Sequence, residues 1–208
     1  MSAAAEPVRR RRNARGEGER LRAELLEAAA NLMATNGDIE SISLRAVARE
    51  AGVSATAVYR HFDDHHDLLR ESVVYCWTNF RQSLTESRRG ITDPFDALQA
   101  LRAAYVQFAL DHPGQYRVMF SNRMQPEGDS AVIGLAAYQV LVDSVAEILG
   151  VLGDDRDPYF VAAQLHTWLH GVVDLWSNHP DVSWPGADRL IDSMTEVIGI
   201  DRRPATDI

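Results

Sequence analysis

The chain has 208 residues and a formal net charge of −9, and all 21 of its basic residues are arginines. This length is sufficient for a hydrophobic core, and 46% hydrophobic and 25% charged residues exclude wholesale disorder and a collagen-like repeat. The single cysteine excludes an intramolecular disulfide and indicates a cytoplasmic protein, and we expect no membrane span.

The charge is distributed unevenly along the chain. Residues 1–62 hold 10 Arg against 8 acids, a balance of +2, whereas residues 63–208 hold 11 Arg against 22 acids, a balance of −11. Five of the arginines lie within residues 1–16. This asymmetry predicts a small cationic module attached to a larger acidic one, although an arginine-rich end can also be a solvated tail.

Apolar residues recur with helical spacing along most of the chain, and no segment alternates as a strand does. The sequence therefore predicts an all-α fold of about nine helices. The expected helices cover residues 17–36, 43–51, 54–61, 65–88, 94–111, 113–120, 130–149, 159–178 and 188–198. The segments 122–129 and 179–186 are polar or rich in proline, and we expect them to be loops.

Two short helices in residues 41–62 have the spacing of a helix-turn-helix. Ser43 and Ser54 can each cap one of them, and Gly52 can provide the sharp turn between them. The same spacing also fits a plain helical hairpin. The DNA-binding interpretation is favoured by side chains that can hydrogen-bond phosphates or bases. These are Ser54, Thr56, Tyr59, Arg60 and His61, with Arg45 and Arg49 on the preceding helix.

These residues resemble the TetR family of transcriptional regulators. The resemblance is carried by Asn36-Gly37, by Ser43-x-Arg45-x-Val47-Ala48-x-x-Ala51-Gly52-Val53-Ser54, by Val58-Tyr59-x-His61-Phe62 and by Asp64 with Leu68-Leu69. Residues 112–120 and the string Trp168-Leu169-His170-Gly171 resemble a C-terminal subfamily of these regulators that is named for its Trp-His-Gly signature. The resemblance implies an N-terminal three-helix DNA-binding domain and a C-terminal helical domain for ligand binding and dimerisation.

The resemblance also implies roles for individual residues at a DNA operator. Tyr59 and His61 match positions that contact the phosphate backbone, and Arg45 matches one that reaches into the groove. Ala55 and His65 stand where the family often has a basic residue. The expected DNA-binding residues are Arg45, Ser54, Ala55, Thr56, Tyr59, Arg60, His61 and His65. We expect residues 1–16 to be a disordered arm that binds the minor groove or phosphates.

Large aromatic side chains are spread over the helices of the acidic part. Any one of them can be ordinary core, but as a set they suit the wall of a cavity for an apolar or aromatic small molecule. The expected pocket residues are Trp77, Phe80, Tyr105, Phe108, Tyr116, Phe120, Tyr138, Trp168, His170 and Trp176. Asn79 and Gln107 are further candidates for polar contacts.

The last two long helices are expected to form a homodimer. An apolar stripe on 159–178, with Gly171 permitting close approach, and the final helix would together make a four-helix bundle across a two-fold axis. The expected interface residues are Leu165, Leu169, Val172, Leu190, Met194 and Val197.

The sequence is therefore interpreted as a ligand-responsive repressor with four parts. They are a basic arm (1–16), a DNA-binding domain (17–63), a ligand-binding and dimerisation domain (64–200) and a tail (201–208). We expect no enzyme activity, cofactor or metal. The alternatives are a TetR-like activator without a ligand and a helical protein that binds a small molecule or a metal and has a basic tail. The spacing of His166, His170 and Asp174 permits such a metal, and Cys76 is expected to be buried and inert.

Overall fold

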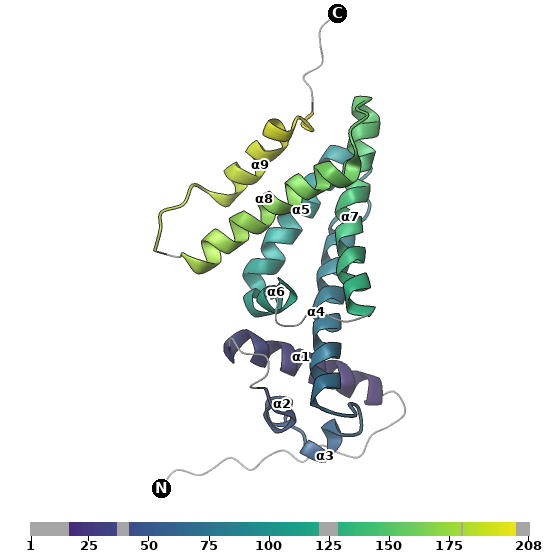
Figure 1. The fold of residues 1–208 in the computed structure, drawn as a ribbon, viewed down its shortest axis with the longest axis vertical. Helices are drawn as coiled ribbons and strands as arrows, with labels where there is room; N and C mark the ends of the chain where they lie inside the picture. The colour runs from purple at the N-terminus through teal and green to yellow at the C-terminus, as the bar shows by residue number, and fades with distance from the viewer. Residues whose placement is uncertain (1–16, 37–41, 121–128, 180, 203–208) are drawn as a thin grey trace, which may run out of the picture.

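The computed structural model describes residues 17–36, 42–120, 129–179 and 181–202, and every regular element within these ranges is a helix. The helices are α1 (Glu17–Asn36), α2 (Leu44–Glu50), α3 (Ala55–Val58), α4 (His65–Ser87), α5 (Pro94–Asp111), α6 (Pro113–Phe120), α7 (Asp129–Leu152), α8 (Pro158–Asn178) and α9 (Ala187–Ile198). In Figure 1, α1 to α3 form a small unit at the bottom, α5 to α9 form a larger one above it, and α4 runs from one into the other. The predicted all-α architecture is confirmed.

The predicted helix starts are present as capping hydrogen bonds. The hydroxyl of Ser43 accepts from the backbone N–H of Ala46 at 3.2 Å, and that of Ser54 accepts from Ala57 at 3.3 Å. Gly52, between the two helices, has a φ of 67°, a conformation that side chains with a Cβ rarely adopt. Sequence and local geometry therefore agree on the turn.

Two helix ends differ from the expected ones. Helix α3 is regular only over Ala55–Val58, but His61 and Phe62 still bond to the carbonyl of Val58, so the chain keeps turning to Phe62. Helix α7 continues three residues beyond the expected end at residue 149, because the chain does not reverse until Gly153, whose φ is 62°.

The described residues form two hydrophobic cores, and α4 belongs to both. Its first half contributes Leu68, Leu69 and Val73 to the core of α1 to α3. Its second half contributes Phe80 and Leu84 to the core of the larger unit. The two units therefore share a continuous helix, which begins at His65, just after the expected domain boundary at residue 63.

A second connection between the units passes through α6 and α1. Val118 of α6 packs into the core of the small unit, whereas Met119 next to it packs into the core of the large one. Ala30 of α1 is buried in the larger core, and Arg22 of α1 pairs with Glu71 of α4 at 3.1 Å. Helices α4 and α6 thus hold α1 in a defined position against the larger unit.

The strongly apolar helix expected over residues 130–149 extends to Leu152. Ile133–Leu152 in α7 has the length and composition of a membrane span, with a mean hydropathy of 1.6. Val145 and Ile148 in this segment are fully buried in the larger core, where α7 packs against α4, α5 and α8. This position accounts for the apolar residues on the inward side of the helix.

Candidate nucleic-acid interface and ligand cavity

The helix-turn-helix buries one face and exposes the other. Val58 and Phe62 point into the core of the small unit, which fixes the rotation of α3. Thr56, Tyr59 and Arg60 are consequently exposed, and the Tyr59 side chain is 58% accessible. The predicted DNA-facing side chains of α3 are thus presented by a helix whose orientation is set by two buried apolar residues.

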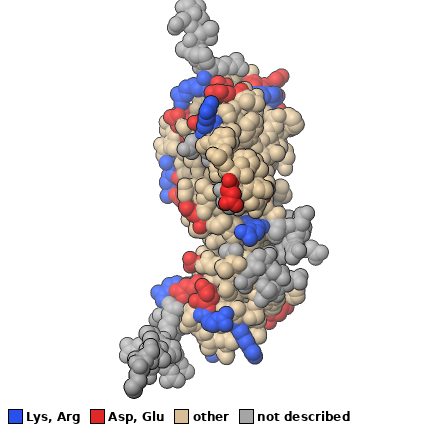
Figure 2. All heavy atoms as spheres, turned by 90° about the vertical axis from the view of Figure 1, so that its left-hand side faces the viewer, with Lys and Arg blue, Asp and Glu red and all other residues tan. Residues whose placement is uncertain are grey.

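Arginines add positive charge to this end of the molecule. Arg45 and Arg49 on α2 are exposed, like Arg60 after α3. Figure 2 shows arginine side chains on the surface of the lower end, where the small unit lies. The five arginines of residues 1–16 lie outside the described residues.

The remaining predicted DNA contacts are either half-buried or already hydrogen-bonded within the chain. Ala55 and His61 are half-buried, and the oxygen of Ser54 is engaged as the cap of α3. His65 is drawn inward, because its Nε2 donates to the backbone carbonyl of Ile42, which links the start of α4 to the chain before α2. The structure therefore does not place His65 with the exposed polar groups.

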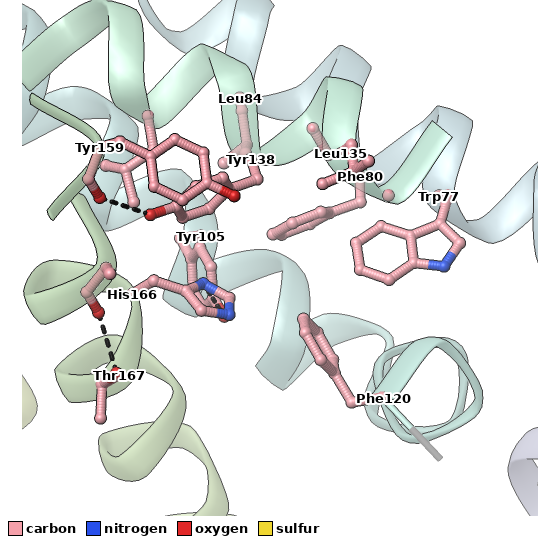
Figure 3. A pocket seen from close by; sticks show the side chains of 14 residues that line it. Trp77, Phe80, Leu84, Tyr105, Phe120, Leu135, Tyr138, Tyr159, His166 and Thr167 are labelled. Atoms are coloured by element: carbon pink, nitrogen blue, oxygen red, sulfur yellow. Dashed lines mark hydrogen bonds between the residues drawn. The ribbon is translucent and has the colours of Figure 1, made fainter. Parts of the chain in front are cut away.

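A cavity of about 320 Å³ opens in the larger unit. It lies between α4, α5, α6, α7 and α8, and aromatic rings from several of these helices face one another across it (Figure 3). Its lining consists of Trp77, Phe80, Leu84, Tyr105, Phe120, Gly134, Leu135, Ala137, Tyr138, Leu141, Tyr159, Ala163, His166 and Thr167. None of these residues is an acid, an arginine or a lysine, so the described wall of the cavity carries no formal charge at neutral pH.

Most polar atoms of the wall are already hydrogen-bonded to the protein. The Tyr138 hydroxyl donates to the carbonyl of Tyr159 at 2.9 Å, and the Thr167 hydroxyl donates to that of Ala163 at 2.8 Å. Within the described residues, the indole N–H of Trp77 and the hydroxyl of Tyr159 make no hydrogen bond, and of the two His166 nitrogens only Nδ1 has a partner, the hydroxyl of Tyr105 at 3.5 Å. Burial, with a smaller contribution from His170, lowers the pKa of His166 from 6.5 to about 4, so its ring is neutral at pH 7.

A second cavity of about 200 Å³ lies beside the first. The ring of Phe120 belongs to the walls of both and stands 5.8 Å from the ring of His166 and 4.6 Å from that of His170. The lining of this smaller cavity is more polar and consists of Pro113, Tyr116, Arg117, Phe120, His170, Val173, Asp174, Ser177 and Asn178.

Five of the ten expected pocket residues line the larger cavity, namely Trp77, Phe80, Tyr105, Phe120 and Tyr138. Tyr116 and His170 line the smaller one. The other three lie elsewhere: Phe108 packs behind Phe80 in the core, Trp168 faces the outer side of α8, and Trp176 stacks on Trp184 at 5.5 Å.

Helical spacing did not predict the polar residues and the small residues that line the cavity. Gln107 is exposed and donates to Asp111, and Asn79 does not line either cavity. His166 does line the larger cavity, although the sequence suggested it only as a possible metal ligand. Its neighbour Thr167 and the small residues of α7 were not anticipated, because helical spacing alone does not reveal which apolar face borders a void.

The sequence offers one candidate metal site and one cysteine. Within the described ranges, no three His, Cys, Asp or Glu side chains gather closely enough to hold a metal ion. Cys76 is buried, and burial raises the pKa of its thiol to about 12, which keeps it protonated.

The expected dimer residues fall into two groups. Leu165, Leu169, Val172 and Met194 are buried within the protomer, where α8 and α9 pack on the larger core, so they have no surface to offer a partner. Leu190 is partly exposed, and Val197 is 70% exposed. Helix α8 is apolar on two sides, and periodicity could not indicate which side faces outward.

The outward side of α8 carries its own apolar stripe. Phe160 lies two turns before Trp168, with the exposed Gln164 between them. Gly171 and Leu175 follow Trp168 at helical spacing, and all four are exposed or half-buried. A Cβ added at Gly171 would meet no atom within 4 Å, so this stretch of the stripe is open.

Helix α9, which lies next to this stripe, is held in place by arginines. Arg102 is buried and donates to the carbonyl of Ile191 at 2.5 Å. Arg156 donates to the carbonyl of Ile198 at 2.7 Å, and Arg202 pairs with Asp93 at 2.9 Å. These contacts hold the surface that α8 and α9 present together.

Comparison with known proteins identifies both parts of the chain. Residues 25–71 match the model for bacterial regulatory proteins of the tetR family, and residues 98–198 match the model for the tetracycline-repressor-like C-terminal domain.

Solved structures share the whole fold. A protein of unknown function from Rhodococcus sp. RHA1 is 26% identical, with a TM-score of 0.73 over 86% of this chain and 93% of that one. A TetR-family regulator from Mesorhizobium loti is 21% identical, with a TM-score of 0.66 over 89% and 97% of the two chains. FadR from Bacillus subtilis, solved with stearoyl-CoA, is 14% identical, with a TM-score of 0.70 over 84% and 96%.

The low pKa of His166 predicts a loss of stability in mild acid. The unfolded chain takes up a proton at this residue near pH 6.5 and the folded chain only near pH 4, so the free energy of unfolding falls as the pH drops through that interval. Between pH 7 and pH 5 we expect His166 to lower the free energy of unfolding by about 1 to 2 kcal/mol, allowing for its partial exposure. Urea denaturation at the two pH values measures the loss.

A His166→Phe variant keeps a ring in the wall and removes this titration. Its loss of stability between pH 7 and pH 5 should be smaller than that of the wild type by about that amount. His66→Gln, a change at an exposed histidine on α4, is the matched control. An equal pH dependence in the wild type and in His166→Phe would contradict the assignment.

Proposed function

Since the chain belongs to the TetR family of transcriptional regulators, we propose that it is a cytoplasmic, homodimeric repressor that leaves its operator when a mainly apolar small molecule fills the larger cavity. The observation that carries the proposal is the double role of α4. One half of this helix packs under the helix-turn-helix, and the other half supplies Trp77, Phe80 and Leu84 to the wall of the cavity. A ligand that displaces α4 therefore moves the DNA-binding unit as well.

The exposed end of the small unit suits double-stranded DNA. Tyr59 and Arg60 after α3, with Arg45 on α2, offer hydrogen-bond donors to phosphates and base edges, and α3 is the helix that would enter the major groove. In a dimer the two copies of α3 would read half-sites of a near-palindromic operator about 34–36 Å apart. The acidic remainder of the chain favours approach by the basic end.

Substitutions at this end should weaken DNA binding in a way that depends on salt. DNA selected from genomic fragments by the wild type provides the operator for fluorescence anisotropy at several salt concentrations. Arg60→Ala and Tyr59→Phe should each lower the affinity about tenfold or less. If Arg60 contacts a phosphate, Arg60→Ala should also reduce the slope of log affinity against log salt concentration by about 1 per half-site. Arg81→Ala, an exposed arginine on the distal half of α4, is the control for lost charge. Unchanged affinity in both variants would exclude this surface.

The open apolar stripe on α8 supports the proposed dimer. Phe160 is 61% exposed, and Val197 of α9 presents another apolar side chain on the neighbouring helix. Two such helix pairs can close a four-helix bundle by two-fold symmetry, with Gly171 allowing the α8 helices to approach closely. The interface proposed here is therefore the exposed stripe, in place of the buried residues expected from the sequence.

Gly171→Arg tests the dimer without disturbing the protomer. Because a Cβ added at this position meets no atom within 4 Å, folding should be preserved, whereas the long arginine side chain would hold a partner helix away. We expect analytical ultracentrifugation at micromolar concentration to show a dimer for the wild type and mainly monomer for Gly171→Arg, with at least a tenfold loss of operator affinity. Gly150→Arg, at another helical glycine with open space, should remain dimeric. A dimer that persists in Gly171→Arg would contradict this interface.

The wall of the larger cavity supports an uncharged effector. FadR from Bacillus subtilis was solved with stearoyl-CoA, a ligand that carries several phosphates. The described lining in this chain contains no arginine that could pair with such a group. A neutral, mainly apolar molecule avoids the cost of placing a charge in this wall.

Filling the cavity with a bulky side chain should prevent the effector from releasing the operator DNA. Leu135 lines the cavity and is 59% exposed, so Leu135→Trp can occupy the space without displacing a buried neighbour. Neutral aromatic compounds are first screened for release of the selected operator from the wild type. The concentration of an active compound needed for release should rise at least tenfold in Leu135→Trp and stay unchanged in Leu110→Trp, on the exposed side of α5. If no compound releases the DNA, the alternative of a regulator without a ligand is favoured.

A further inference from the structure

Four polar groups form a continuous chain between the two cavities. Nδ1 of His170 lies 2.6 Å from the hydroxyl of Tyr116, which lies 2.9 Å from the hydroxyl of Tyr105. The Tyr105 hydroxyl lies 3.5 Å from Nδ1 of His166, the longest of the three contacts. The chain therefore begins at His170 in the smaller cavity and ends at His166 in the wall of the larger one.

The protons in this chain can be arranged in only two ways that leave no tyrosine hydroxyl proton unpaired. Burial lowers the pKa of both histidines, so each ring is neutral and carries a single N–H, and each tyrosine has one O–H. All three contacts receive a proton, with neither tyrosine proton left unused, only if every group donates in the same direction. Donation toward His170 leaves Nε2 of His166 as an acceptor, and donation toward His166 leaves that nitrogen as a donor.

The charge of Asp174 favours one of these directions. Asp174 lies one helical turn after His170 on α8 and lines the same small cavity. Burial lowers the pKa of His170, and the carboxylate of Asp174 partly offsets this effect; burial raises the pKa of Tyr116, and the same carboxylate adds to that rise. Arg117 lines that cavity too, but its side chain is exposed and is not among the causes of either shift. The geometry favours the same direction: the Tyr116–His170 contact of 2.6 Å is much shorter than the Tyr105–His166 contact of 3.5 Å, and an imidazole nitrogen is a stronger acceptor than a phenol oxygen. Nδ1 of His170 therefore accepts from Tyr116, and the proton of the His170 ring lies on Nε2.

This direction determines what the larger cavity presents to a ligand. Tyr116 donates to His170, Tyr105 donates to Tyr116, and Nδ1 of His166 donates to Tyr105. Nε2 of His166 then has an unshared electron pair, and it has no hydrogen bond to the described part of the chain. Figure 3 shows the His166 ring at the wall between Tyr105 and Phe120, among the aromatic rings that line the space.

We propose that the larger cavity selects an uncharged aromatic molecule that carries a hydrogen-bond donor, such as a phenolic hydroxyl, and that this donor binds Nε2 of His166. The inference rests on the proposed function and specifies the class of its effector. The aromatic walls accept the ring in edge-to-face contacts. His166 is the group that touches the ligand, and Tyr105, Tyr116 and His170 are positioning residues that set its tautomer.

Three probes that share one ring system test the selectivity. Calorimetric titration of the wild type should give tightest binding for 2-naphthol, binding about threefold to tenfold weaker for 2-methoxynaphthalene, which cannot donate, and the weakest binding for the anion 2-naphthoate. His166→Phe should remove the difference between the first two probes.

Tyr116→Phe provides a sharper test, because Tyr116 does not line the larger cavity. Without the Tyr116 hydroxyl, the proton of Tyr105 has Nδ1 of His166 as its remaining acceptor, so Nε2 of His166 becomes a donor. We expect 2-methoxynaphthalene to bind Tyr116→Phe at least as tightly as 2-naphthol does, although the wall is unchanged. Tyr75→Phe, at a half-buried tyrosine packed in the other core, should keep the wild-type ratio.

The outcomes separate this inference from the proposed function. If the wild type binds 2-naphthol and 2-methoxynaphthalene equally, or if Tyr116→Phe keeps the wild-type ratio, the hydrogen-bond chain does not select the ligand and the inference fails while the cavity remains a binding site. If none of the probes binds, the cavity does not take aromatic molecules, and the proposed effector site fails with it. Circular dichroism of each variant confirms that it is folded.

Discussion

Helix α4 has to pack in two hydrophobic cores at once, and the rest of the arrangement follows from this constraint. Leu68 and Leu69 anchor its first turns under the helix-turn-helix, and Phe80 and Leu84 anchor its second half in the larger unit. A helix cannot bend within a few residues without losing backbone hydrogen bonds. The two ends of α4 are therefore coupled mechanically, as the proposed function requires, and the contact of α6 with α1 joins the two units at a second point.

The cavity lies where the packing of the large unit changes from aliphatic to aromatic. Edge-to-face contacts among Trp77, Phe80 and Phe120 leave a space that these rigid rings cannot fill completely. Several polar groups beside it are tolerated because they are hydrogen-bonded within the protein. The buried Tyr105 illustrates this: it keeps its proton because burial raises its pKa, and its hydroxyl is satisfied by Tyr116.

Arginines have different roles at the two ends of the molecule. Exposed arginines near α3 are available to a partner, whereas several arginines of the larger unit are used within the fold. Arg102 and Arg156 donate to carbonyls of α9 or of the turn after it, and Arg202 joins the end of the described chain to the start of α5. These bonds fix α9 beside the open stripe of α8, so the surface proposed for dimerisation is preformed.

The sequence by itself determined the local features of this protein. Ser43, Ser54 and Gly52 act through groups a few residues away, so caps, turn and helix order could be predicted, and the resemblance to the TetR family identified both units. Tertiary structure decided which side of each helix faces the core, the cavity or the solvent. Helix α8 is apolar on two sides, and only its packing showed that one side is core and the other is open. His166 joined the cavity, and His65 turned to the carbonyl of Ile42, because both depend on neighbours that are distant in sequence and that no periodicity encodes.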